Sequence, residues 1–392
     1  MQMMTSIKSL FSSFRGGNNS HIMDSLLNNE ELTLEQLLDS DLELLSELRN
    51  QNKALIEYFS PKVLSHLLTY VLVEPLTDDI KQGHKYPFVC NEIIACEIPQ
   101  ILDHFFNEQG LLDQLFSFLN ERQVNLTLAG YFSSIASILL RHNSYELLSH
   151  IHEMRDMGKV LVDHLYSTSV MNFVWKLMAD EDHGNPAYVA KLDEMVEFVL
   201  AGYCETGKVG FYMQIVNSAA MISGLLRNHG DTTNWTYVQQ TVSFSPNADI
   251  LINCSLGGNQ VLAVASLSII EAYLGNLDVR NSEDNIVSNE ISYLLELLCE
   301  KVPRYCEILK IPNNTLGMTR LNVIKLLAGL MKLTFTEVKQ AIKLNNIPAV
   351  FLVNFIQDLI PLFPWNSFLH NIVCETIINI LLGDDAEIKE QV

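Results

Sequence analysis

The sequence has 392 residues and is strongly acidic, because 25 lysines and arginines stand against 46 aspartates and glutamates and leave a net charge of −21. Apolar residues make up 48% of the chain and provide ample material for a core. Nucleic acids and anionic membrane surfaces bind clustered cations. The chain has no basic run, so we expect neither as a partner. We also find no stretch close to the roughly 20 apolar residues that span a bilayer, and expect no membrane insertion.

The first residues differ in character from the rest. Residues 1–20 are expected to form a poorly ordered lead-in, because chain ends without packing partners rarely hold structure. The run from Gly16 to Asn19 would also interrupt a helix. A single helical-repeat domain is expected over residues 21–392.

Several residue patterns in the sequence predict where helices begin. Thr33 is followed three residues later by Gln36, which predicts a capping box. Ser60 precedes Pro61, and proline is well suited to the first helical position because its missing N–H has no partner there. The same reasoning predicts further starts at Ser167, at Thr334 with Glu337, and at Ile347 with Pro348.

Apolar residues recur at spacings of three, four and seven between these starts, which is typical of amphipathic helices. Clear examples are residues 63–72, 111–119, 129–140 and 170–178. Two polar interruptions are expected, at Val73–Tyr86 and Asn276–Glu290. The region Trp235–Leu256 is expected to hold a short strand or an irregular loop.

No segment alternates convincingly at the period of two that marks a half-buried strand. Helices of moderate length with short polar connections favour an all-α fold, an armadillo- or HEAT-like α-solenoid of stacked helix pairs or triplets. In such a stack each repeat leaves an apolar face that only its neighbour covers, and the stack offers an extended concave surface.

The seven cysteines are odd in number and lie mostly in apolar, helix-like segments, with no C-x-x-C spacing. This usage predicts buried thiols in a reducing compartment. We therefore expect no disulfide framework and no zinc site, and a location in the cytoplasm, with the nucleus as a second compartment.

Motifs of known catalytic chemistry are absent from the sequence: there is no P-loop, no G-x-G-x-x-G after a strand, no G-x-S-x-G and no H-E-x-x-H. The run Asp180–Gly184 is the best metal-like cluster, but adjacent residues cannot easily converge on one ion. We expect no catalytic, metal or cofactor-binding residues, hence a protein that is not an enzyme. The alternative is a helical metal hydrolase that uses Asp180, Asp182 and His183.

Partner-binding candidates lie near the end of the chain. Trp365 stands in a break between two apolar helices, where it either caps the core or anchors a partner, since Trp is enriched in interface hot spots. Asn366 and His370 are four residues apart and share a helix face, so they either bind a partner or cap the turn. Arg320 opens a helix with Thr319 as its expected cap, and either pairs with a neighbouring repeat or contacts a partner.

Five segments, in chain order, resemble motifs of one known family: residues 19–27, 32–59, 86–93, 317–328 and 363–370. The fourth, Gly317-Met318-Thr319-Arg320-Leu321-Asn322-Val323-Ile324, is similar to the motif G-x-x-R-L-x-V-[IV]. The fifth, Phe363-Pro364-Trp365-Asn366-Ser367-Phe368-Leu369-His370, is similar to Y-x-W-N-N-F-L-H. These are motifs of the SAPS-domain proteins, the regulatory subunits of protein phosphatase 6 and its fungal counterpart. Residues 180–290 match weakly, and family members usually continue with more helices and an acidic tail.

The resemblance implies a noncatalytic scaffold that binds a protein phosphatase 6-like Ser/Thr phosphatase catalytic subunit and directs its substrate choice, in some lineages together with an ankyrin-repeat subunit. The alternative is a generic armadillo-like adaptor unrelated to phosphatases. Such adaptors often carry Asn or Trp ladders, and none is apparent in the sequence.

Overall fold

Every regular element that the structure describes is a helix. The structure is a computed structural model, and it describes residues 32–75, 79–154, 156–179, 211–227, 233–283, 291–310, 315–350, 353, 355 and 358–382. No strand occurs within these residues, which confirms the expected all-α class. Residues 1–20 lie outside them. The chain divides into two compact units, residues 1–150 and 151–392.

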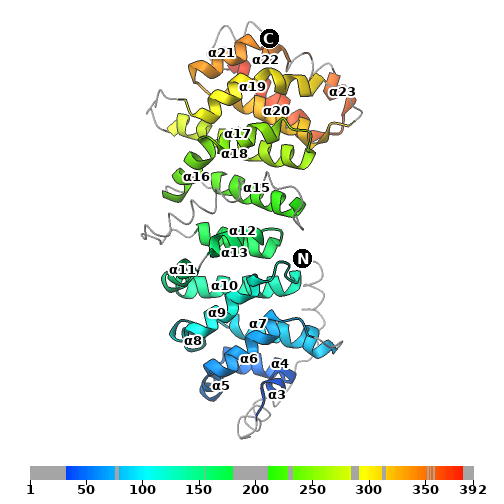
Figure 1. Cartoon of the computed structure of the whole chain (residues 1–392). Helices are drawn as coiled ribbons and strands as arrows, with labels where there is room; N and C mark the ends of the chain where they lie inside the picture. Colours follow the sequence, from blue (N-terminus) through cyan, green and yellow to red (C-terminus); the bar gives the residue numbers. More distant parts are fainter. Residues whose placement is uncertain are drawn as a thin grey trace. The chain divides into compact units, whose positions relative to one another are not determined.

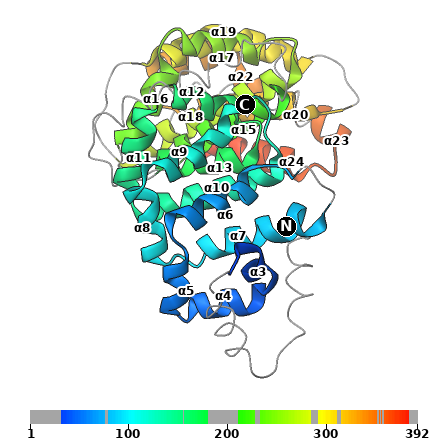
Figure 2. The same ribbon diagram turned by 60° about the horizontal axis from the view of Figure 1, so that its bottom comes forward.

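Unit 1 begins with short helices and continues with longer ones (Figures 1 and 2). Its helices are α3 (Leu34–Asp39), α4 (Asp41–Arg49), α5 (Lys53–Tyr58), α6 (Pro61–Leu72), α7 (Tyr86–Ile94), α8 (Pro99–Asn107), α9 (Gln109–Ser117), α10 (Leu126–His142) and α11 (Ser144–Glu153), which crosses the boundary. A π-helical turn, Lys81–Lys85, precedes α7, and a 3₁₀ turn, Phe118–Asn120, follows α9.

The core of unit 1 forms where α6, α7, α9 and α10 pack together. Phe132 of α10 lies at its centre, edge-on to Phe116 and stacked on Phe118, with ring centroids 5.7 and 5.5 Å apart. Such aromatic pairs add to the free energy gained from burial alone.

The predicted start at Pro61 is confirmed, with Ser60 in the cap position.

The helices of unit 2 are α12 (Met157–Asp163), α13 (Thr168–Ala179), α15 (Phe211–Arg227), α16 (Thr233–Ser243), α17 (Asn247–Ser255), α18 (Gln260–Glu283), α19 (Tyr293–Lys310), α20 (Gly317–Lys332), α21 (Thr336–Leu344), α22 (Ile347–Val350), α23 (Ile360–Leu362) and α24 (Ser367–Leu382). They pack as two rows. In the first row α13, α15, α18, α20 and α24 each contact the next. The second row runs from α16 and α17 through α19 to α21, and it covers one side of the first.

Buried asparagines join neighbouring helices of the first row. Asn217 of α15 donates its Nδ2 to the carbonyl of Leu165, 2.7 Å away, just before α13. Asn276 of α18 donates in the same way to the Leu226 carbonyl at the end of α15. Because a buried polar group is costly without a partner, these bonds favour one relative placement of the helices.

The predicted helix starts have mixed outcomes. The capping box of Thr33 and Gln36 is present, with both reciprocal hydrogen bonds. Ser167 is also confirmed as a cap, since its Oγ accepts from the Val170 N–H. The predicted capping box at Thr334 and Glu337 is wrong. Helix α21 begins at Thr336, so Phe335 and not Thr334 occupies the cap position.

The expected strand or loop at Trp235–Leu256 is also wrong, because this region forms α16 and α17. Val238 and Val242 are four residues apart and both are buried, which is a helical rather than a strand spacing. The interruption expected from Asn276 is partly wrong as well, since α18 continues to Glu283. The tertiary hydrogen bond of Asn276 gives its buried Nδ2 a partner at a position that suggested a break.

One helix of the described residues is long and apolar enough to cross a membrane by length and composition. This is Gln260–Leu277 of α18, which corrects the expectation that no stretch comes close. The window is 61% buried within the protein, as is usual for a core helix.

Candidate interaction surface

The loop of residues 363–366, which we call the Trp365 loop, presents its tryptophan to solvent. Trp365 is 96% exposed, so it does not cap the core as one alternative predicted. Leu362 and Phe368, on either side of the loop, are also mostly exposed. An indole and two further apolar side chains in water form the kind of patch that marks interaction sites.

Asn366 and His370 hold the Trp365 loop in place. The Asn366 Oδ1 accepts from the Leu369 N–H at 3.0 Å and so caps α24. The His370 ring reaches back with Nε2 3.2 Å from the Phe363 carbonyl oxygen. Of the two roles predicted for this pair, these bonds fit the turn-capping one, and they fix the backbone on both sides of Trp365.

The exposed side of α24 extends this patch. Leu369, Val373, Thr376 and Ile380 form the buried stripe of the helix, against α20. The remaining positions include the exposed apolar residues Phe368, Ile378, Leu381 and Leu382. The solvent side of α24 therefore carries four exposed apolar residues beside the polar Asn371, Glu375 and Asn379.

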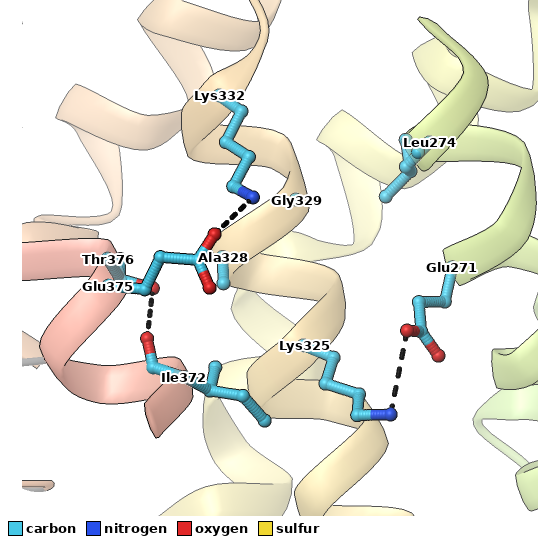
Figure 3. Close-up of a pocket in the computed structure, with 10 residues that line it drawn as sticks. Glu271, Leu274, Lys325, Ala328, Gly329, Lys332, Ile372, Glu375 and Thr376 are labelled. Atoms are coloured by element: carbon cyan, nitrogen blue, oxygen red, sulfur yellow. Dashed lines mark hydrogen bonds and ion pairs between the residues drawn. The ribbon is translucent and has the colours of Figure 1, made fainter. Parts of the chain in front are cut away.

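A pocket of about 220 Å³ opens between α18, α20 and α24, and we call it the first-row pocket. Figure 3 shows Lys325 and Lys332 extending from α20 on either side of Gly329. Lys325 pairs with Glu271 of α18 at 3.5 Å, and Lys332 pairs with Glu375 of α24 at 2.7 Å. Leu274, Gly275, Ala328, Ile372 and Thr376 complete the lining.

A further cation lies at the edge of this pocket. The Arg227 guanidinium, at the end of α15, is 3.8 Å from Glu271. Glu271 therefore lies between cations of two neighbouring helices. The charged residues Arg227, Glu271, Lys325, Lys332 and Glu375 come from four helices of the first row, α15, α18, α20 and α24. Arg227, Lys325 and Lys332 outnumber Glu271 and Glu375 by one charge, in a chain whose net charge is −21.

Arg320 lies on α20 and is buried, with 8% of its side chain exposed. Burial favours a structural role over contact with a partner. Within the described residues it forms no ion pair with a neighbouring helix. Thr319 is not the cap, because α20 already begins at Gly317, which adopts a φ of 69°.

The other candidates for chemistry have separate outcomes. Residues 180–184 lie outside the described residues. Among the residues that are described, no three His, Cys, Asp or Glu side chains are grouped to hold a metal ion. The described cysteines, Cys90, Cys96, Cys254, Cys299, Cys306 and Cys374, are free thiols. His164 is buried and contacts the Val160 carbonyl at 2.8 Å, as expected of a structural histidine.

Sequence reasoning did not find the first-row pocket. Its only local signal is the repeat of Lys325, Gly329 and Lys332 at spacings of four and three, which places two cations and a gap on one helix face. The carboxylates that pair with them are 43 and 54 residues away in the sequence, so no local pattern connects them.

Comparison with known proteins gives a consistent result. No family model matches the chain. Serine/threonine-protein phosphatase 6 regulatory subunit 3 of Gallus gallus is 25% identical over 97% of this chain and 47% of its own length. Regulatory subunit 1 of Homo sapiens is 30% identical over 41% of this chain and 18% of its own length. Extragenic suppressor of kinetochore protein 1 of Schizosaccharomyces pombe is 24% identical over 38% of this chain and 19% of its own length.

The chain spans about half the length of the curated relatives that it matches from end to end. Regulatory subunits numbered 1, 2 and 3 are all among the similar proteins. They bear the name of the same family whose motifs the sequence resembles. Over most of its length, the chain is similar to a regulatory subunit of serine/threonine-protein phosphatase 6.

Proposed function

We propose that this protein is a noncatalytic regulatory subunit that binds a protein phosphatase 6-like catalytic subunit and directs its choice of substrates. The similarity over 97% of the chain to a protein named as such a regulatory subunit carries the proposal. The absence of catalytic motifs in the sequence supports it.

The proposed architecture is an armadillo- or HEAT-like solenoid. The two rows of unit 2, in which each helix contacts the next member of its row, support this reading. A rigid stack that holds an enzyme and its substrate together raises their effective concentration, to about millimolar for short tethers. Regulation by tethering needs no active site on the scaffold.

The proposed partner-binding surface is the Trp365 loop together with the exposed side of α24. Its support is an indole that the fold holds in water by two capping side chains. An ankyrin-repeat subunit is a proposed third component. The cytoplasm, with the nucleus as a second compartment, is the proposed location.

Affinity purification of the tagged chain from its own cells, followed by native mass spectrometry, tests the function. A stoichiometric complex with a phosphatase catalytic subunit of the phosphatase 6 type is the expected result. Recovery of the chain alone, or with unrelated cargo, would contradict the proposal and favour the generic adaptor.

Replacement of Trp365 by Ala tests the surface. Because the side chain is almost fully exposed, the melting temperature should stay unchanged. Loss of a tryptophan hot spot should weaken the complex by about 2 kcal/mol, or about 30-fold. The matched control is Phe244→Ala, which removes an aromatic ring exposed elsewhere in unit 2. If Trp365→Ala unfolds the protein, or binds as tightly as the control, the Trp365 loop is not the interface.

A further inference from the structure

The backbone at the start of α20 has the geometry of an anion site. Leu316 is in the right-handed helical conformation, with φ −63° and ψ −50°, and the next residue, Gly317, has a φ of 69°. Such a pair turns the N–H groups of Leu316, Gly317 and Met318 toward one point, an arrangement called a nest. We call these three residues the α20 nest. A Cβ added to Gly317 would meet no atom within 4 Å, so the space beside the nest is open.

The N–H groups of the α20 nest lack acceptors. Within the described residues no side chain caps α20, and none of the three N–H groups donates to a backbone carbonyl. The first N–H groups of a helix have no acceptor inside the helix, and the helix dipole adds about half a positive charge at this end. The α20 nest therefore favours an anionic ligand.

Arg320 adds a buried positive charge beside the α20 nest. It is 8% exposed, and in the part of the chain that the structure describes its guanidinium has neither a hydrogen bond nor an ion pair. The other cations of α20, Lys325 and Lys332, both have carboxylate partners. A helical side chain lies over the residues three and four positions before it, so Arg320 runs back over Gly317 and Leu316. Because a buried charge without a partner is costly, an anion in the nest would stabilise the guanidinium.

We propose that the α20 nest and the Arg320 guanidinium together bind a phosphate group. The guanidinium and the helix start carry roughly one and a half positive charges. A phosphate group carries about −1.5 to −2 at pH 7 and offers three acceptor oxygens, whereas a carboxylate has a single charge on two oxygens. The planar guanidinium binds two phosphate oxygens side by side, which leaves the third for the N–H groups. Free phosphate and a phosphorylated side chain share this chemistry, and burial of Arg320 admits either of these small groups.

Inorganic phosphate is the first probe, titrated into the full chain by isothermal titration calorimetry in a chloride buffer of constant ionic strength. Wild type should bind a single phosphate. Arg320→Met should weaken binding by about tenfold or more, because paired charge-assisted hydrogen bonds are lost. The matched control Arg304→Met removes the same charge from an exposed position of α19 and should bind phosphate as wild type does.

The melting temperature separates a ligand site from an ion pair within the chain. Without phosphate, Arg320→Met should melt at the same or a higher temperature than wild type, because an unpaired buried charge is removed. Added phosphate should then raise the melting temperature of wild type and not that of Arg320→Met, since only a chain that binds phosphate is stabilised by it.

Two variants of Gly317 test the nest while Arg320 stays in place. Asp and Asn have the same shape and tolerate a positive φ better than other side chains do. The carboxylate of Gly317→Asp repels phosphate at close range, so this variant should bind phosphate about tenfold more weakly than Gly317→Asn.

A short alanine peptide with blocked ends and one phosphoserine distinguishes the two sources of phosphate. If it binds at least as tightly as inorganic phosphate, and its serine form does not bind, the site receives a phosphorylated side chain of a partner. If only inorganic phosphate binds, the site receives free phosphate.

Four results would overturn the proposal: no saturable phosphate binding by wild type, unchanged affinity in Arg320→Met, a lower melting temperature of Arg320→Met without phosphate, or equal affinities of Gly317→Asp and Gly317→Asn. None of these measurements involves a phosphatase. Failure of the phosphate site therefore leaves the proposed regulatory function standing, and failure of the catalytic subunit to co-purify leaves the phosphate site standing.

Discussion

At the residue scale, buried asparagine side chains determine how neighbouring helices of unit 2 pack. Asn217 is 6% exposed, and its Nδ2 lies 2.7 Å from the Leu165 carbonyl and 3.5 Å from that of Tyr166. Apolar contacts between helices tolerate sliding, whereas a hydrogen bond between a side chain and one named carbonyl does not.

Asn217→Ala should therefore lower the free energy of unfolding by roughly 1–3 kcal/mol, because a buried hydrogen bond is lost without replacement. Chemical denaturation followed by circular dichroism measures the change. Asn371→Ala, at an exposed position of α24, is the matched control and should change stability by less than about 0.5 kcal/mol. Equal effects of both variants would mean that the bond of Asn217 contributes nothing.

The thiols also differ from one another by their surroundings. Burial, together with the nearby carboxylates of Glu337 and Glu296, raises the pKa of Cys299 to about 11. The thiolate is the reactive form. A raised pKa leaves less of it at pH 8, and the fraction then grows as the pH approaches 11.

Alkylation of Cys299 by iodoacetamide at pH 8 should therefore be about two hundred times slower than for a thiol with the ordinary pKa of about 8.5. The rate should rise about tenfold per pH unit up to pH 10. Peptide mapping by mass spectrometry reads each site separately. Glu337→Gln should speed the reaction at pH 8. A rate at Cys299 that stays constant between pH 8 and 10 would contradict the raised pKa.

At the scale of elements, two helical glycines have opposite surroundings. Gly224 of α15 lies directly beneath the ring of Trp175 from α13, which a Cβ would approach to 2.2 Å. Gly275 of α18 has open space instead. The same residue type thus permits close helix packing in one place and leaves a pocket in the other.

Gly224→Ala should destabilise the protein by about 1–3 kcal/mol, because the Trp175 ring must move out of its packed position. Gly275→Ala should stabilise it by up to about 1 kcal/mol, because alanine is the better helix former and nothing obstructs its methyl group. Thermal unfolding of both variants measures whether each substitution lowers or raises the stability. The combination Gly224→Ala with Trp175→Leu should recover part of the loss, and an additive effect would argue against the contact.

For the whole molecule, charge is the dominant feature. A net charge of −21 and an isoelectric point near 4.8 mean that the folded chain carries strong self-repulsion at neutral pH. Ion pairs among the described residues offset it only locally, as at Lys332 and Glu375.

The melting temperature should accordingly rise when sodium chloride is increased from about 20 to about 200 mM at pH 7.5, because salt screens the repulsion. Scanning calorimetry at constant buffer composition measures the shift, and potassium chloride should produce the same one. A melting temperature that falls with salt would mean that attractive pairs outweigh the repulsion.

The sequence by itself determined the class of fold and most helix positions. Caps such as that of Thr33 and starts such as that of Pro61 depend on residues within one turn of each other. Helical periodicity is equally local, since it needs only the spacing of apolar residues. Val238 and Val242 also have this spacing, but the Thr and Ser residues around them concealed the helix α16, which packing against α15, α17 and α19 stabilises.

Only the tertiary structure decided which polar and aromatic residues face inward. Trp365 lies in water and Asn276 in the core, against the usual preference of either residue type. The sequence indicated Asn366 and His370, but only their distances to Leu369 and Phe363 identify them as the supports of the Trp365 loop. The first-row pocket joins Lys325 and Lys332 to glutamates 43 or more residues away. Such a site arises when helices distant in the chain come into register, and that register depends on packing between helices and not on any local pattern.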